Sequence, residues 1–518
     1  MNNRKRNALI AILILFSILA LGSGYIKKSD AKNTEKEIVN SDVGLEEIPS
    51  DYLVDDSFIS HLPIVVIDIG EEEIPLAYNY DIEKGIVVPI EDVDPYVNGE
   101  MFIYAGNEVN SLSDTPQTTS GMHIKYRGNS SLFYEKKQYK IELLDENGLE
   151  ISKNLLGMGA DSDWILNISM ADKSLLRNYI AYTIAGEIDE YTPDVQYCEV
   201  LIKKGEKYEY EGLYLLCESI KVDDDRVDLS DYNKDGISSY LLKRDRYDEE
   251  AVNLDTWATE NNLTYGSITI EYPKADNLTK ETISNIEDRI STIEKILYSD
   301  NENDFEEIWD YIDKDSFVDY FLLNEYFGNY DAGNNSTYMY SNLGGKLHIG
   351  PVWDFDGGCD NYADVPAEID KIAFETVTWF DKLTEHYSFD IALERRYKEL
   401  QKTVLNEQYV NNLIDETVEY IGRAQLRDYS RWGKAYSEYV LADSNSEYGV
   451  YTERNVDSFE EEVQRLKNYI TEHSGAMNYE IHNLSANHYS QSYNSNYGIW
   501  AIVFIVLFLS SIVIVRKR

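Results

Sequence analysis

The stretch NYDAGNNSTYMYSNLGGKLHIGPVWDFDGG, residues 329–358, reads as a β-hairpin with acidic and amide residues at both ends. STYMY and KLHIGPVW are rich in the residues that strands favour, and SNLGG between them supplies glycines for a tight turn. With a turn centred on residues 343 and 344, Tyr340 lies opposite Leu347 and Asp331 lies opposite Asp356. The sequence therefore predicts that acidic residues from the two ends of this stretch meet in space.

Asp331, Asp354 and Asp356 are expected to converge there. Carboxylates gathered in one place repel each other unless a cation lies among them. Oxygen ligands of this kind suit Mg²⁺ or Mn²⁺, and Mg²⁺ usually shares its coordination shell with substrate phosphates.

Phosphoryl transfer needs such an arrangement. Asp331 would orient the incoming hydroxyl and accept its proton. Asn335 or Asn334 would bind one metal ion, and Asp354 would bind the metal that bridges the phosphates. Asp356 would assist as a ligand or brace the loop. In so acidic a chain, however, a pair of Asp residues two apart is weak evidence when taken alone.

The bulk composition sets limits on the function. The chain has 518 residues, of which 43% are hydrophobic, enough for a substantial core. Its formal net charge of −47 argues against a nucleic-acid partner, because a phosphate backbone would be repelled. A metal or a cationic partner is easier to accommodate, although the acidity is equally explained by a solvated surface.

Both ends of the chain carry apolar runs beside basic residues. Residues 1–24 have the pattern of a signal peptide or signal anchor. Residues 498–515 approach the ~20 residues that cross a bilayer, and residues 516–518 form a basic tail. The positive-inside tendency predicts a membrane-anchored protein with an extracytoplasmic main domain and a cytoplasmic C-terminus.

Four segments lie between these ends. We expect an acidic linker at 25–60, a β-rich region at 61–115, a large domain at 116–475 and a polar linker at 476–497. The large domain begins with strand patterns around one amphipathic helix and becomes mainly helical from about residue 280. A mixed α/β small lobe followed by a helical large lobe predicts an α+β, bilobal enzyme with a cleft.

Several motifs occur in a fixed order: RGNSS, KKQYKIEL, DKSLLRNYIAY, YEGLYLLCESIK, NEYFGNYDAGNNSTYMY and KLHIGPVWDFD. Over roughly residues 60–475 the chain thereby resembles the CotH family, the spore coat protein H-like atypical protein kinases. The resemblance implies an atypical protein-kinase-like fold and ATP- and metal-dependent phosphorylation of Ser or Thr in surface or spore-coat proteins of a bacterium. It matches Asp331 to the catalytic-loop aspartate and Asp354 to the metal-binding aspartate.

The resemblance also suggests residues for the nucleotide. A kinase-like lobe holds the phosphates with a strand lysine, for which Lys136, Lys137 and Lys140 are candidates. We favour Lys137, where the family has paired lysines. Arg127 would clamp a phosphate, and Glu218 would lie where the backbone faces adenine or else pair locally.

Two alternatives remain open at this stage. One is a catalytically inactive CotH-like protein used in adhesion or coat assembly, since Ser336 stands where a kinase catalytic loop has Asn. The other is a carbohydrate-active enzyme, because paired carboxylates near tryptophan also suit glycoside hydrolysis. Metal-dependent nucleotide binding separates the kinase from both.

Overall fold

The largest element of the fold is an eight-stranded sheet with the order β1-β14-β12-β9-β8-β6-β3-β13. All its ladders are antiparallel except the one between β13 and β3. Because β13 also pairs with β14, the strand order closes on itself. Its strands are β1 (Leu53–Val54), β3 (Ile64–Asp68), β6 (Val97–Tyr104), β8 (Thr118–Tyr126), β9 (Tyr139–Leu144), β12 (Asp163–Asn167), β13 (Val195–Lys204) and β14 (Lys207–Glu218).

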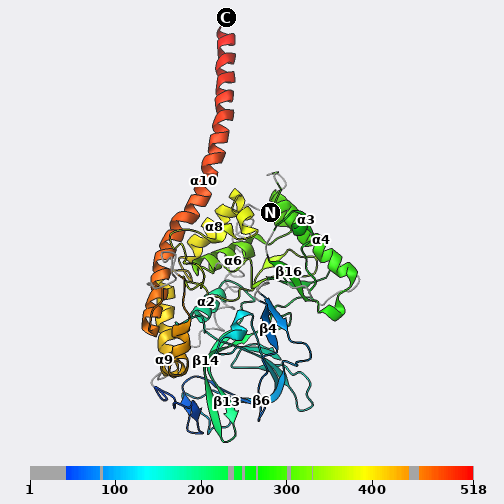
Figure 1. Cartoon of the computed structure of the whole chain (residues 1–518). Coiled ribbons are helices and arrows are strands. Elements are labelled where there is room, and N and C mark those ends of the chain that lie inside the picture. The colour runs from blue at the N-terminus through cyan, green and yellow to red at the C-terminus, as the bar shows by residue number, and fades with distance from the viewer. Residues whose placement is uncertain are drawn as a thin grey trace, which may run out of the picture. The chain divides into compact units, whose positions relative to one another are not determined.

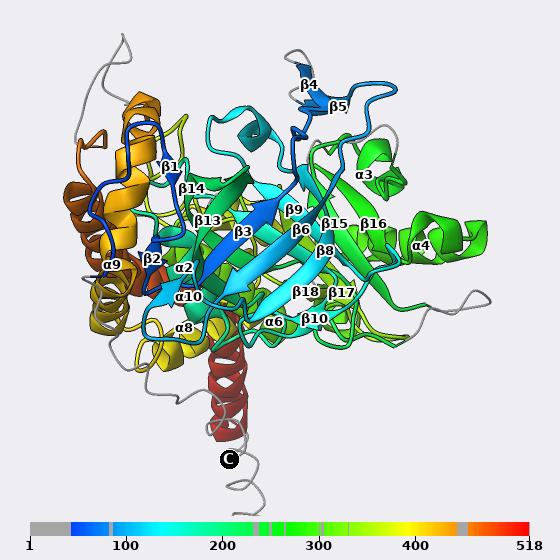
Figure 2. The same ribbon diagram turned by 90° about the horizontal axis from the view of Figure 1, so that it is seen from below.

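The computed structural model describes residues 43–81, 86–230, 238–247, 251–263, 266–299, 301, 305–329, 331–442 and 454–516; the side chains of residues 86 and 488–516 are not described. Figure 2 shows β3, β6, β8 and β9 side by side in the sheet, with the hairpin of β4 and β5 apart from them.

The strand sequences explain the sheet. In β8 and β9, buried and partly exposed residues alternate, as expected where one face meets the core. Strands β13 and β14 are buried along most of their length and form a long hairpin with a register shift between Val200 and Leu201. Such an irregularity increases the local twist of a strand pair.

A second, four-stranded sheet has the order β16-β15-β17-β18. In it Tyr340 pairs with His348, one residue later than the predicted partner Leu347. Its strands are β15 (Tyr240–Asp245), β16 (Ser267–Tyr272), β17 (Thr337–Ser341) and β18 (His348–Ile349). Three two-stranded ladders pair β2 (Ile59–Ser60) with β7 (Asn110–Ser111), β4 (Tyr78–Asp81) with β5 (Ile86–Pro89), and β10 (Lys153–Asn154) with β11 (Ala160–Asp161).

Several helices begin at side-chain caps. Thr279, Asp313 and Asn406 accept backbone N–H groups at the starts of α4, α6 and α9. The α-helices are α2 (Arg177–Ala185), α3 (Thr256–Glu260), α4 (Lys280–Leu297), α6 (Lys314–Tyr326), α7 (Phe380–Leu383), α8 (Tyr387–Leu400), α9 (Glu407–Glu438, kinked at Gly422) and α10 (Phe459–Arg516). Short 3₁₀ helices are η1 (Ser130–Phe133), η2 (Ala275–Asn277), η3 (Glu306–Asp310) and η4 (Phe374–Thr376).

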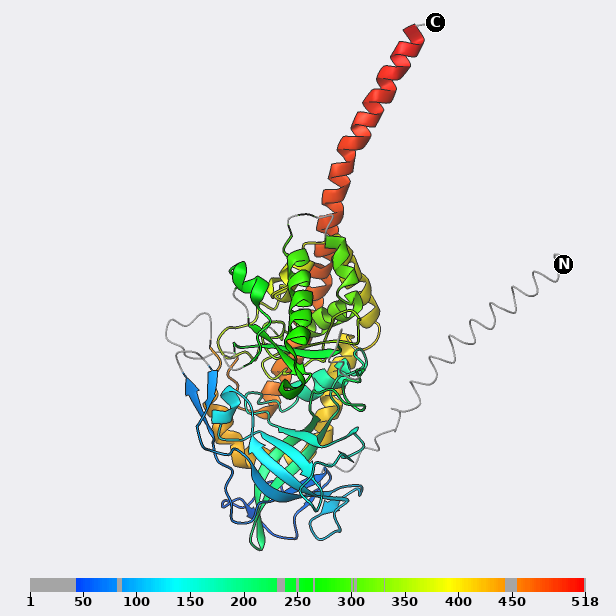
Figure 3. The same ribbon diagram turned by 90° about the vertical axis from the view of Figure 1, so that its right-hand side faces the viewer.

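The C-terminal helices pack directly against the N-terminal strands. Helix α9 contacts β14, and α10 contacts α6, α8 and α9 (Figure 1). Figure 3 shows the first part of α10, in orange, running beside these elements. A buried ion pair joins Arg427 of α9 to Glu199 of β13, with 2.6 Å between the guanidinium nitrogen and the carboxylate oxygen.

This packing corrects the fold predicted from the sequence. Residues Asp42–Arg518 form a single compact unit. One hydrophobic core runs through it and includes Val65 of β3, Ile286 of α4, Ile414 of α9 and Leu466 of α10. The prediction of a bilobal kinase-like fold is therefore wrong, because the strands of the first half and the helices of the second half bury their apolar faces against each other.

The predicted membrane segments also need correction. Across the part of the chain that the structure describes, none of the helices combines the length and hydrophobicity that crossing a bilayer requires. The described residues therefore do not support the predicted anchoring and localisation in a cell membrane. Residues 1–24 lie outside the described residues, and residues 498–515 continue α10 with side chains that are not described. The predicted linker at 476–497 belongs to the same helix.

Candidate active site

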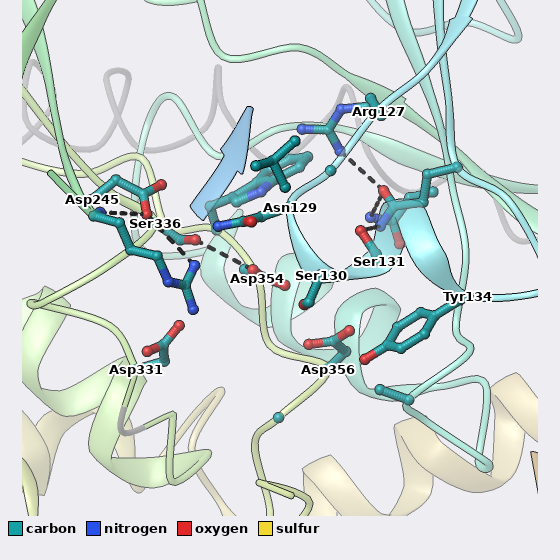
Figure 4. A pocket seen from close by; sticks show the side chains of 18 of the residues that line it. Arg127, Asn129, Ser130, Ser131, Tyr134, Asp245, Asp331, Ser336, Asp354 and Asp356 are labelled. Atoms are coloured by element: carbon teal, nitrogen blue, oxygen red, sulfur yellow. Dashed lines mark hydrogen bonds and ion pairs between the residues drawn. The ribbon is translucent and has the colours of Figure 1, made fainter. Parts of the chain in front are cut away.

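A cavity of about 970 Å³ lies where the two sheets approach each other. Its walls come from the β4–β5 hairpin, the Arg127–Ser131 segment after β8, the ends of β15 and β16, and the loop that follows β18. This volume is within the range of pockets that hold a nucleotide-sized ligand. Asp331, Asp354 and Asp356 all line it, and Figure 4 shows the three carboxylates around one space, with Asp354 between the other two in that view.

Asp331 lies in a tight turn before β17. The backbone N–H of Asn335 donates to its carbonyl oxygen at 2.9 Å, and the Asn335 side-chain amide donates to its carboxylate at 2.6 Å. Burial raises the pKa of Asp331 above its ordinary value, an effect that the amide of Asn335 opposes. A carboxylate with a raised pKa and a fixed orientation suits a general base.

Helix α2 positions the loop that carries Asp354. The Asp354 N–H donates to the hydroxyl of Tyr182 at 3.1 Å, and the Phe355 N–H donates to the side-chain oxygen of Asn178 at 2.8 Å. Asp354 has a φ of 67°, a left-handed conformation that is unfavourable for a non-glycine residue and that surrounding contacts must hold. The Ser336 hydroxyl donates to its carboxylate at 3.3 Å.

Asp356 lies beside Asp354 in the same pocket. Burial and the Asp354 carboxylate together raise the pKa of Asp356 well above its ordinary value. Gly358 lets the loop turn close to the core, because a Cβ there would lie 2.8 Å from the carbonyl oxygen of Phe327. The sequence thus brings two like-charged groups together in a partly buried place, which is unfavourable without a compensating cation.

These residues fit a divalent metal ion that also binds phosphates. Within the described residues, no group of three His, Cys, Asp or Glu side chains is close enough to hold a metal alone. Mg²⁺ in kinase sites, however, is held by one or two carboxylates together with phosphate oxygens and water. Asp354 and Asp356 supply that pair, and a cation would remove their mutual repulsion.

The two asparagines proposed as ligands have other contacts. The Asn335 amide orients Asp331, while the side-chain oxygen of Asn334 accepts the hydroxyl of Thr378 at 2.8 Å. Neither asparagine lines the cavity. Asn335 as a metal ligand therefore remains a prediction, and in the structure its side chain contacts Asp331 instead.

Arg127 lines the cavity, as predicted for a phosphate clamp. Its guanidinium donates to the side-chain oxygen of Gln138 at 3.0 Å and lies over the ring of Trp353, 5.7 Å from the centroid. The guanidinium of Arg127 thus lies at the cavity wall (Figure 4).

The three lysines near β9 lie outside the cavity lining. Lys137 donates to the carbonyl oxygen of Leu132 at 2.8 Å, and burial lowers its pKa. Lys136 is fully buried and pairs with Asp428 at 2.6 Å, whereas Lys140 pairs with Glu142 at 2.7 Å. The predicted role of Lys137 in binding phosphate stays a prediction, because its side chain does not line the cavity.

Glu218 also lies away from the cavity. Its carboxylate accepts Arg226 at 2.8 Å and the N–H groups of Gly159 and Asp194, each at 3.0 Å. Burial nevertheless raises the pKa of Glu218 to about 7. These contacts connect the loops of Gly159, Asp194 and Arg226 to the end of β14. They agree with local pairing of Glu218, which was the alternative to a position facing adenine.

Sequence reasoning missed the cations contributed by β15. Lys243 and Arg246 line the cavity with Asp245, and Lys243 pairs with Asp245 at 2.6 Å. They reach the site because β15 pairs with β17, so that Lys243 lies opposite Tyr338. The sequence KRDR at 243–246 carries the charges, but the pairing joins strands about a hundred residues apart, so no local pattern revealed it.

The comparison with known families agrees with the motifs. The CotH family, described as CotH kinase protein, matches residues 124–477, more than half of the chain. The chain therefore belongs to the CotH family, a kinase-like family, and the resemblance drawn from the sequence is confirmed. A search of curated proteins found no match to the chain.

Proposed function

We propose that this protein is an ATP-dependent protein kinase that transfers the γ-phosphate to Ser or Thr of protein substrates with Mg²⁺ or Mn²⁺. The observation that carries the proposal is the placement of Asp331, Asp354 and Asp356 on one cavity in a chain of the CotH family. Surface or spore-coat proteins are the substrates that the family relationship suggests.

Asp331 is the residue proposed to handle the proton. The hydroxyl oxygen of the substrate attacks the γ-phosphorus, the bond from that phosphorus to the β–γ bridging oxygen breaks, and ADP leaves. The hydroxyl proton passes to the Asp331 carboxylate. Asn335 supports this role, since its amide holds the carboxylate in one orientation at 2.6 Å.

Asp354 and Asp356 are the residues proposed to hold the metal. A bound divalent cation would neutralise charge that develops on the phosphate oxygens. The Ser336 hydroxyl and the α2 contacts to residues 354 and 355 fix the loop, so the carboxylate position is set by the protein before a ligand arrives.

Phosphate oxygens need further cations. Arg127 lies at one side of the cavity, and Lys243 of β15 and Arg246, the residue after that strand, line the same cavity as Asp331. Burial disfavours the charge on Lys243, but Tyr338 and Asp245 outweigh it and raise the pKa of Lys243, so it stays protonated at neutral pH. These cations support binding of a polyanionic nucleotide without the strand lysine predicted at Lys137.

The proposal is tested by incubating the full-length chain with ATP labelled in the γ-phosphate, Mg²⁺ or Mn²⁺, and a generic Ser/Thr protein. We expect metal-dependent labelling that Asp331→Ala and Asp354→Ala abolish. Asp415→Ala, which removes a carboxylate paired with Lys467 at the surface, is the control and should label normally. Labelling that persists in Asp331→Ala would exclude Asp331 as the base.

The position of Lys137 favours a second candidate, a CotH-family protein that does not transfer phosphate and serves in surface or coat assembly. Its ammonium group is bonded to the carbonyl of Leu132 rather than facing the cavity. Absence of labelling in the wild type, together with no thermal shift on adding Mg²⁺ and ATP, would favour this candidate.

A further inference from the structure

The loop with the paired aspartates continues into a segment that the C-terminal helix holds. After Asp356 the chain passes through Cys359 and Asp360, which have φ values of 51° and 57°. Two consecutive non-glycine residues in the left-handed region are unfavourable and persist only where surrounding contacts fix them. The contacts around these two residues therefore determine the shape of the loop.

Three arginines, Arg177, Arg454 and Arg465, supply those contacts. Arg177 of α2 donates to the carbonyl oxygen of Gly358 at 2.8 Å. Arg454, just before α10, pairs with the Asp360 carboxylate at 3.0 Å and donates to the carbonyl of Tyr362 at 2.7 Å. These bonds hold the segment on either side of Asp360.

Arg465, on the second turn of α10, makes the connection that reaches the site. Its guanidinium donates to the carbonyl oxygen of Asp360 at 2.8 Å and to the side-chain oxygen of Asn361 at 3.0 Å. The Asn361 amide in turn donates to the backbone carbonyl of Asp356 at 2.7 Å. Two side chains thus link α10 to the residue beside Asp354.

The same arginine is itself fixed. Glu462, one turn earlier on α10, binds Arg465 at 2.8 Å and Arg177 at 2.8 Å, and its side chain is buried. The carboxylate therefore joins α10 to α2, and α2 in turn positions Asp354 and Phe355 through Tyr182 and Asn178. The start of α10 and the loop of the paired aspartates form one connected ionic and hydrogen-bonded unit.

We propose that Arg465 is a positioning residue that sets the geometry of the Asp354–Asp356 loop through Asn361, so that the start of α10 controls binding at the pocket. This inference rests on the proposed function for its consequence in nucleotide binding, but not for the structural coupling itself. Arg465 does not line the cavity, so it acts through the loop and not by touching a ligand.

The test compares Arg465→Ala, Arg465→Lys and Lys467→Ala in the full-length protein. Lys467 lies on the same helix two residues on and pairs with Asp415 at the surface. Amide hydrogen exchange of residues 357–361 and the Kd for ATP with Mg²⁺ are measured for each. We expect at least about tenfold faster exchange and at least about tenfold weaker binding in Arg465→Ala, intermediate values in Arg465→Lys and wild-type values in Lys467→Ala.

A second control separates local from global loosening. Arg396→Ala removes a two-bond contact to Asp319, at 2.6 and 3.0 Å, away from the cavity. The inference is overturned if Arg396→Ala accelerates amide exchange of residues 357–361 as much as Arg465→Ala does. It is also overturned if these residues exchange at the same rate in Arg465→Ala as in Lys467→Ala. Should Arg465→Ala fail to fold, Arg465→Lys carries the test, and wild-type exchange in that variant overturns the inference.

The two proposals fail in different ways. If the wild type does not bind ATP with Mg²⁺, the proposed function fails, while the exchange data still decide whether α10 holds the loop. If the wild type binds ATP and the loop of Arg465→Ala is unchanged, the proposed function stands and the coupling is wrong.

Discussion

Two groups of carboxylates lie near enough for Asp172 of one to act electrostatically on Asp356 of the other, and only one group is paired with a cation. Asp172 and Glu462 are buried and share Arg177, at 2.5 and 2.8 Å. Asp331, Asp354 and Asp356 face the cavity and, among the described residues, form no ion pair. Asp331 accepts the amide of Asn335, Asp354 accepts the hydroxyl of Ser336, and Asp354 and Asp356 are hydrogen-bonded to each other.

The difference separates a group that is compensated within the fold from the group proposed to bind a ligand. When a buried carboxylate is paired with an arginine, its negative charge is already balanced, and removing the arginine destabilises the folded protein. Like-charged carboxylates gathered at a cavity wall are an unfavourable arrangement that a bound cation would relieve. The following predictions test this contrast in order of decreasing effect.

The largest effect is expected for Asp354→Asn. Removing the carboxylate proposed to bind the metal should lower the rate of phosphate transfer by about 10³-fold or more, because a bound metal would contribute several kcal/mol to charge stabilisation. The rate is measured at saturating Mn²⁺ and ATP. Asp415→Asn makes the same charge change at the surface, and an equal loss in that control would show that net charge alone is responsible.

Asp331→Asn should reduce kcat by about 10²- to 10⁴-fold, the usual contribution of a general base. Because the substitution keeps the shape and leaves the metal residues intact, the Kd for ATP with Mg²⁺ should change little. The two quantities come from steady-state kinetics and calorimetry. A large rise in Kd with unchanged kcat would instead make Asp331 a binding residue.

Arg177→Ala tests the compensated group. It leaves Asp172 and Glu462 buried without their shared cation, and the free energy of unfolding in urea should fall by about 3–5 kcal/mol. Arg127→Ala, which removes a cation from the cavity wall, should change the free energy of unfolding by about 1 kcal/mol or less. Equal losses in the two variants would remove the distinction between the groups.

The smallest effect concerns the buried pair of His473 and Glu325, 3.1 Å apart. Burial lowers the pKa of His473, but the bond and charge of Glu325 outweigh it and raise the pKa above its ordinary value of about 6.5. The pair therefore adds stability that is complete below pH about 6.5 and is lost as pH rises through the folded-state pKa.

His473→Gln removes that contribution. The difference in unfolding free energy between wild type and variant, measured from pH 5 to 9 (roughly the range over which histidine titrates), should be largest at the acidic end and narrow as pH rises. A difference that is constant across this range would mean that the pKa of His473 is the same in the folded and the unfolded protein, which contradicts the raised pKa.

The sequence predicted the meeting of the three aspartates at one cavity better than it predicted the architecture. Asp331, Asp354 and Asp356 do line one cavity, but the reason given for their meeting, pairing along a hairpin, does not extend as far as these residues. The predicted register is wrong by one residue. The second strand is also shorter than predicted, because β18 ends at Ile349 and the residues that follow form a loop. Loop geometry, held by Tyr182 and Asn178, brings the carboxylates together instead.

What could not be predicted depends on long-range contacts. Strand β15 reaches the pocket only through pairing with β17, and Arg465 reaches Asn361 across about a hundred residues. The separation into two lobes was inferred from a change in local pattern at residue 280. Local patterns carry no information on whether α9 packs on β14, which is the contact that unites the fold.

The most direct test of the central claim is a crystal structure of the protein with Mn²⁺ and a non-hydrolysable ATP analogue, using the anomalous signal of manganese. We expect a manganese peak between Asp354 and Asp356, with the γ-phosphate facing Asp331. A nucleotide bound elsewhere, or a cavity that holds neither metal nor analogue at saturating concentrations, would contradict it.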